Sequence, residues 1–138
     1  MAATLEFELV SPERLLRSEP VEMVVVPGGE GNFGVLPGHS LLISTVRPGL
    51  IEIYEAGKVK DRIFVAGGFA EVTPERCTVL ADEAVPLPDL NRAALEAEAR
   101  ELEGRLHNST DEAVKANARR VLAVIDAKLI ALNAATAH

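Results

Sequence analysis

Several kinds of residue and pattern are scarce in this sequence, and each scarcity argues against a class of protein. There is one cysteine, Cys77, so no internal disulfide can form, and the apolar alternation around it favours a buried thiol over a nucleophile. A net charge of −7 argues against nucleic-acid binding, which needs clustered Lys and Arg. No apolar run approaches the ~20 residues of a membrane span, and the first residues do not resemble a signal peptide. We expect a globular protein of a reducing, cytosol-like compartment.

Clusters of chemically reactive side chains are scarce as well. The three histidines, His39, His107 and His138, stand far apart, and no His-x-x-x-His or Cys-x-x-Cys spacing suggests a metal site. For His39, which follows a Pro-Gly turn, a loop residue that hydrogen-bonds backbone groups is favoured over a catalytic base. The glutamates between positions 96 and 103 are typical of a solvated helix face. We therefore expect no active site, no cofactor and no metal.

The composition changes near residue 87. All eight prolines lie between Pro12 and Pro88, and all five aromatic residues lie at or before Phe69. The prolines at 86 and 88 favour a stiff, extended connection that no helix can continue through. We predict a domain boundary here, with one domain at 1–87 and a second at 88–138.

Residues 1–87 show the pattern of short strands. Leu5, Phe7 and Leu9 alternate with glutamates, as in a half-buried strand. Further strands are expected at 21–26, 41–46, 50–54, 63–66, 69–72 and 78–81, with Gly- and Pro-containing turns between most of them. Because this spacing leaves no room for crossover helices, the sequence predicts an antiparallel β-sandwich or barrel.

Residues 88–138 predict an antiparallel two-helix hairpin. Asp89 is the expected N-cap of the first helix, and Ser109 with Glu112 is the expected capping box of the second. Apolar residues at helical spacing form the expected packing stripe: Leu95, Ala99, Leu102, Leu106, Val114, Ala118, Val121, Ile125, Leu129 and Leu132. Alanine makes this stripe shallow, so stability must come largely from whatever the hairpin packs against. The hairpin is therefore a candidate for movement or partner binding.

The segment Gly29-x-Gly31-x-x-Gly34 has the spacing of phosphate-binding glycine loops. Such a loop must be followed by a helix whose N-terminus holds the phosphate. Here Pro37-Gly38 interrupts the chain, and no stretch after it is long enough for that helix. The glycines need another explanation.

Four segments resemble one known family in the same order along the chain. The most specific is "EGNFGVLPGHSLL" at residues 30–42, which is similar to E-G-x-[FL]-G-[VIL]-x-P-G-H-A-x-L-L, with Ser40 in place of the usual alanine. The others are "LVSPE" from Leu9, "RPG" from Arg47 and "VLAD" from Val79. The chain resembles the epsilon subunit of bacterial F-type ATP synthases, whose mitochondrial counterpart is called delta.

The resemblance implies a non-catalytic rotor subunit at the foot of the central stalk, peripheral on the cytoplasmic face of the bacterial inner membrane. The sandwich would contact the gamma subunit and the polar loops of the membrane rotor ring, and so couple ring rotation to gamma. The glycines would shape a tight contact loop rather than a phosphate site. The implied contact residues are Glu30, Gly31, Asn32, Phe33, Gly34, Pro37, Gly38 and His39. The hairpin would extend along gamma, reach the catalytic head subunits and inhibit ATP hydrolysis.

Some family members bind ATP through [IL]-D-x-x-R-A at the start of the first helix. One register places Asn91 on the aspartate and Ala94 on the arginine, and the other matches Asp89 and Arg92 but puts Pro88 on the apolar position. A plain helix cap at Asp89 is therefore favoured over a nucleotide site. Two other functions stay open: a stand-alone β-sandwich module that docks an unrelated protein, and, least favoured, a phosphate-handling enzyme. Co-purification with gamma and ring subunits would distinguish them.

Overall fold

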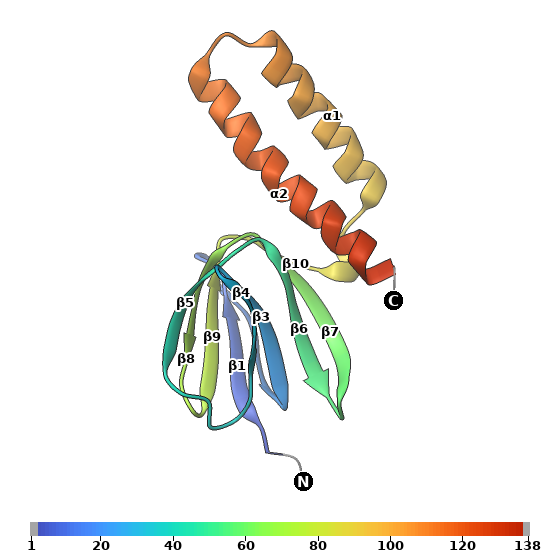
Figure 1. Ribbon diagram of the computed structural model, residues 1–138. Helices are drawn as coiled ribbons and strands as arrows, with labels where there is room; N and C mark the ends of the chain where they lie inside the picture. The colour runs from blue at the N-terminus through green and yellow to red at the C-terminus, as the bar shows by residue number, and fades with distance from the viewer. Residues whose placement is uncertain (1–2, 137–138) are drawn as a thin grey trace. The chain divides into compact units, whose positions relative to one another are not determined.

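The computed structural model describes residues 3–136 (Figure 1). Contacts divide the chain into two compact units, one up to Pro86 and one from Leu87 onward. The first unit holds the strands β1 (Leu5–Val10), β2 (Leu15–Val21), β3 (Met23–Gly28), β4 (Gly31–Val35), β5 (Leu42–Val46), β6 (Gly49–Glu55), β7 (Lys58–Val65), β8 (Gly68–Val72), β9 (Arg76–Ala81) and β10 (Ala84–Pro86). The second holds a short 3-10 helix, η1 (Leu87–Asp89), and the helices α1 (Arg92–Asn108) and α2 (Glu112–Thr136).

The strands form one curled sheet in the order β10-β7-β6-β3-β5-β8-β9-β1-β2, with β4 paired to β3. The predicted fold class, an antiparallel β-sandwich or barrel followed by a two-helix hairpin, is confirmed. One pairing departs from the antiparallel prediction, because β1 lies parallel to β9, with Phe7 opposite Cys77. These strands are distant in sequence, so no hairpin connection dictates their direction.

The curl brings strands near the two ends of the sheet together. Arg17 on the terminal strand β2 places its Nη1 2.6 Å from Oδ2 of Asp61 on β7. Lys60 of β7 lies 3.7 Å from Glu19 of β2. Because β2 has a strand partner on one side only, these ion pairs hold its outer side close to β7.

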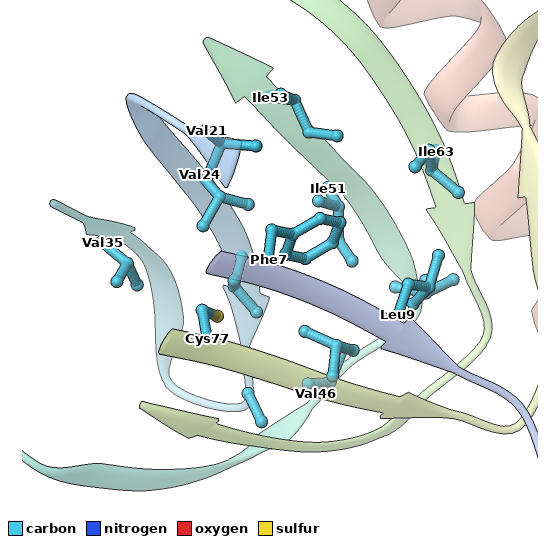
Figure 2. Packing of buried hydrophobic residues seen from close by; sticks show 14 of the residues in the cluster. Phe7, Leu9, Val21, Val24, Val35, Val46, Ile51, Ile53, Ile63 and Cys77 are labelled. Atoms are coloured by element: carbon cyan, nitrogen blue, oxygen red, sulfur yellow. The ribbon is translucent and has the colours of Figure 1, made fainter. Parts of the chain in front are cut away.

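The core of the sandwich consists of the inward-facing side chains of strands in which buried and exposed residues alternate. Leu5, Phe7 and Leu9 of β1 are buried while the residues between them face outward. Figure 2 shows Phe7 at the centre of this packing, with Ile51 and Val24 directed toward it from other strands. The alternation that predicted the strands therefore also identified the core.

Three strands were missed by the sequence analysis. β10 has only three residues and lies next to the segment interpreted as a stiff connection. β2 is largely polar on both faces, so it shows no apolar alternation. β4 contains two glycines and was assigned to the contact loop. All three are peripheral strands held chiefly by one neighbour, a position that requires little burial.

The helical unit is the predicted hairpin, and its two helices pack through a core of their own. Leu95 and Leu102 of α1 pack with Ala118 and Ile125 of α2, and Ala99, Leu106, Val121, Leu129 and Leu132 border them. Val114 does not join this core, since 42% of it is exposed. The stripe prediction is wrong at this residue, which lies within the first turn of α2.

Both predicted helix caps are wrong by two residues. Asp89 ends the 3-10 helix, and Asn91 caps α1 instead, its Oδ1 accepting a hydrogen bond from Ala94 N at 3.0 Å. In α2, Asp111 is the cap, accepting from Ala113 N at 2.9 Å. Ser109 instead accepts from Asp111 N. Neighbouring Asp, Asn and Ser residues all suit the cap position, so composition alone does not choose among them.

Candidate partner-binding surface

The glycine-rich segment forms the tip of the β3–β4 hairpin. Gly28 pairs with Gly31 across the turn, and Gly31 has a φ of +143°, which a side chain would strain. Arg47 braces the tip, since its Nη1 donates to the Gly28 carbonyl at 2.5 Å and its Nη2 to Asn32 Oδ1 at 2.6 Å. The conformation of the tip thus depends on glycine at position 31, and the hydrogen bonds from Arg47 hold it in place.

The loop conformation expected of this segment is wrong in part, because residues 31–35 form the strand β4, and the contact role of these residues stays a prediction. Gly34 has ordinary backbone geometry, whereas Gly38 has a φ of +85°. His39 donates from Nδ1 to the Ser40 carbonyl at 2.7 Å, the kind of backbone bond expected of it. No helix follows the glycines, so the phosphate-binding geometry is absent from this segment.

A groove runs between the hairpin tip and β5. Its volume is about 500 Å³, and it is lined by residues 30–33 on one side and 42–45 on the other. Ile43 on its rim is 75% exposed. The groove places the residues of the predicted contact loop beside a second exposed segment.

The outer face of the sheet carries an apolar row that the sequence analysis missed. Phe69 on β8 lies opposite Leu80 on β9, and Leu80 lies opposite Val10 on β1. Val10 lies opposite Leu15 on β2, so these four residues, here called the apolar row, cross four adjacent strands. Phe69 is 57% exposed and Leu80 52%. Contiguous exposed apolar surface is typical of interaction sites, so the apolar row is a candidate partner-binding surface.

Sequence periodicity could not identify the apolar row. Val10, Phe69 and Leu80 belong to strands whose other face is apolar, so those strands satisfy the core pattern without them, and Leu15 lies on the largely polar β2. Only the register of four strands brings the outward residues into one line. The available clue was Phe69, an aromatic residue at an outward position of an alternating strand.

Within 3–136 no group of three His, Cys, Asp or Glu side chains could hold a metal ion, and no buried side chain is polar or charged. Burial raises the pKa of the Cys77 thiol to about 12, so the reactive thiolate is scarce at neutral pH. No helix of residues 3–136 is long and apolar enough to cross a membrane. The features left to explain are the hairpin tip, the apolar row and the helical unit.

Comparison with known proteins identifies the family. Residues 4–87 match the model of the "ATP synthase, Delta/Epsilon chain, beta-sandwich domain". The chain belongs to this family. The ATP synthase epsilon chain of Rhodospirillum rubrum is 60% identical over 131 residues, covering 95% of this chain and 98% of that one. The epsilon chain of Paramagnetospirillum magneticum is 48% identical over 132 residues, covering 96% and 99%.

Solved structures agree with this family. A chain of the Euglena gracilis mitochondrial ATP synthase, in a structure of its OSCP, F1 and c-ring, superposes with a TM-score of 0.80 at 30% identity. That match covers 94% of this chain and 82% of the other. Epsilon chains are non-catalytic subunits, so the interpretation of this chain as a non-enzyme is confirmed through its relatives.

Proposed function

We propose that this epsilon chain is a rotor subunit of the central stalk of a proton-translocating F-type ATP synthase. In this role it links the membrane rotor ring to the gamma subunit and lies peripherally on the cytoplasmic face of the bacterial inner membrane. The observation that carries the proposal is the similarity to ATP synthase epsilon chains over 95% of this chain, joined to an apolar row that is exposed on the sandwich.

The apolar row is the proposed docking surface for gamma. Phe69 and Leu80 are more than half exposed in the isolated chain, which leaves apolar area in water. Covering such area gains about 25 cal/mol per Å², and aromatic anchors at the centre of an interface contribute most. A rotor subunit must transmit torque, and a rigid sheet face serves this better than a mobile loop.

The hairpin tip is the proposed contact with the polar loops of the rotor ring. The contact residues are those expected from the sequence: Glu30, Gly31, Asn32, Phe33, Gly34, Pro37, Gly38 and His39. Asn32 is exposed, and Arg47 holds its side chain in place through a hydrogen bond at 2.6 Å. A fixed tip binds the ring without the loss of conformational entropy that ordering a mobile loop would cost. Its contacts can therefore persist as the ring turns.

The helical unit is the proposed regulatory element, able to reach the catalytic head subunits and restrain ATP hydrolysis. Its helices share a small core of leucine, isoleucine and alanine. Such a core holds the two helices together as one body while burying little surface. Two placements of this body differing by a few kcal/mol could therefore both be populated.

Co-purification tests the rotor assignment. The tagged chain, expressed in place of the native subunit, should bring gamma and ring subunits from detergent-solubilised membranes. The variant Phe69→Ser should lose gamma, whereas Val114→Ser, which changes an exposed apolar residue of the helical unit, should retain it. Recovery of the chain without gamma or ring subunits would refute the proposal.

Cross-linking tests the contact with the ring. In the Cys77→Ala background, a cysteine in place of Asn32 should form a disulfide with a cysteine in the ring's polar loop under mild oxidation. A cysteine in place of Thr110, an exposed residue of the helical unit, serves as the control. Failure at every position from 30 to 33 in the assembled enzyme would exclude the tip as the ring contact.

A further inference from the structure

A second row of side chains lies directly beside the apolar row on the outer face of the sandwich. Glu71 on β8 lies opposite Ile43 on β5 on one side and opposite Thr78 on β9 on the other. Glu71 is also two residues from Phe69 on the same strand, so both point outward from the same face. Glu71 is therefore an exposed carboxylate with Ile43 and Phe69, both more than half exposed, as neighbours.

The other carboxylates of this face have partners within the chain. Glu8 Oε1 lies 3.0 Å from Arg76 Nη1 and accepts a hydrogen bond from Thr78 Oγ1 at 3.4 Å. Glu6 Oε1 accepts from Ser18 Oγ at 3.1 Å. Across residues 3–136, by contrast, Glu71 enters no ion pair and no side-chain hydrogen bond.

A partner that covers the apolar row must also reach Glu71. The carboxylate is the cross-strand neighbour of Ile43 and the same-face neighbour of Phe69, so a surface seated on these residues removes its water. Burying a carboxylate without a counter-charge is strongly unfavourable, whereas a paired and hydrogen-bonded one is tolerated. The partner must therefore supply a cation at this point, or avoid the face altogether.

We propose that Glu71 is a specificity-determining residue of the gamma-binding face, and that gamma presents an arginine or lysine to it within an otherwise apolar patch. Arginine suits the position better, because its planar guanidinium binds a carboxylate through two parallel hydrogen bonds and can stack on Phe69. This inference rests on the proposed function, since it names the partner chemistry of the same face.

The test measures the affinity of the full-length chain for its gamma subunit. Glu71→Gln should weaken binding about tenfold, since it leaves the gamma cation without its counter-charge, and Glu71→Lys about a hundredfold or more through like-charge contact. Glu55→Lys is the matched control. It makes the same charge change at an exposed site on β6, which lies outside the strands of this face, and should stay within about twofold because its surface ion pair contributes little.

A charge swap then identifies the partner residue. Among gamma variants with single Lys or Arg residues changed to Glu, one should restore binding to Glu71→Lys while weakening binding to the native chain. Equal affinities for native and Glu71→Lys, with binding lost in Phe69→Ser, would overturn this inference and leave the rotor assignment standing. No binding of the native chain to gamma would overturn both. Circular dichroism spectra and melting temperatures establish that each exposed-site variant is folded.

Discussion

A β-carbon added to Gly68 would lie 1.8 Å from the carbonyl oxygen of Leu80. The two residues sit on the paired strands β8 and β9, one step from the Phe69–Leu80 pair of the apolar row. Gly68 also has a φ of +132°, a conformation that L side chains rarely adopt. The close approach of these two backbones thus depends on the absence of a side chain at position 68.

Replacing Gly68 with alanine should therefore destabilise the sandwich by about 3 kcal/mol or more, through backbone clash and strain together. Gly34→Ala is the matched control, since a β-carbon there meets only Met23 Sδ at an ordinary 3.7 Å. It should be neutral or stabilising by about 0.5 kcal/mol, because alanine loses less backbone entropy on folding. Urea denaturation measures both, and equal midpoints for the two variants would contradict the geometry.

Cys77 provides a pH-dependent prediction. Its pKa rises from 9.0 to about 12 in the folded chain because burial disfavours the thiolate. The unfolded thiol loses its proton first, so the stability linked to Cys77 is complete below pH 9 and is lost as pH rises toward 12. The expected loss is up to about 1.4 kcal/mol per pH unit. The free energies of unfolding of the native chain and Cys77→Ala should therefore converge between pH 9 and 11.

The same burial predicts the reactivity of the thiol. A thiol-specific reagent at pH 8 should modify Cys77 at a rate that follows global unfolding, and brief treatment of the folded protein should leave it intact. Rapid stoichiometric modification of the native chain would mean that the β1–β9 region opens locally.

The helix caps give a matched pair of substitutions. Asn91→Ala removes the acceptor for Ala94 N and should cost about 1 kcal/mol in the helical unit. Asp89→Ala should cost little, because Asp89 ends the 3-10 helix and does not cap α1. Amide hydrogen exchange in the first turn of α1 measures the difference. A larger effect from Asp89 would support the cap predicted from the sequence.

The sequence predicted the core better than the surface, and the reason is physical. Burial of Phe7, Leu9 and Val79 produces a period of two that one strand shows by itself. The row of Val10, Leu80 and Phe69 exists only through the pairing of strands distant in sequence, including the parallel pairing of β1 with β9. Local pattern cannot supply such a register.

The resemblance of residues 30–42 predicts contact residues in the glycine segment, but it does not predict the structure of that segment. The glycines have separate roles: Gly31 has a positive φ at the turn, whereas Gly34 lies in a regular peripheral strand. The brace from Arg47 to Asn32 links residues fifteen positions apart. Side-chain contacts of this kind depend on the fold around them and have no signature in composition.

The helical unit gives the sharpest functional prediction. Truncation after Leu87 removes α1 and α2 but leaves all ten strands and the sandwich core intact. The shortened chain should therefore remain soluble and still join gamma and the ring, because both contacts are assigned to the sandwich. If the helical unit restrains rotation in the hydrolysis direction, the truncated enzyme should hydrolyse ATP faster in solubilised form. Proton-driven synthesis in membrane vesicles should largely survive.

Point substitutions test whether disrupting the packing of the helical unit has the same effect on ATP hydrolysis as removing the unit. Ile125 is 2% exposed within the core of the helical unit, so Ile125→Asp places a carboxylate in that core. This should destabilise the helical unit by about 3 kcal/mol or more and unfold it. Val121→Asp, at a half-buried neighbour, should act in the same direction. Both should raise hydrolysis as truncation does, whereas Val114→Asp, at an exposed site of the same helix, should leave it unchanged. Because this control adds the same charge to α2 without disturbing its core, it separates the effect of packing from the effect of charge.

Unaltered hydrolysis in the truncated, fully coupled enzyme would show that the helical unit does not inhibit this ATP synthase.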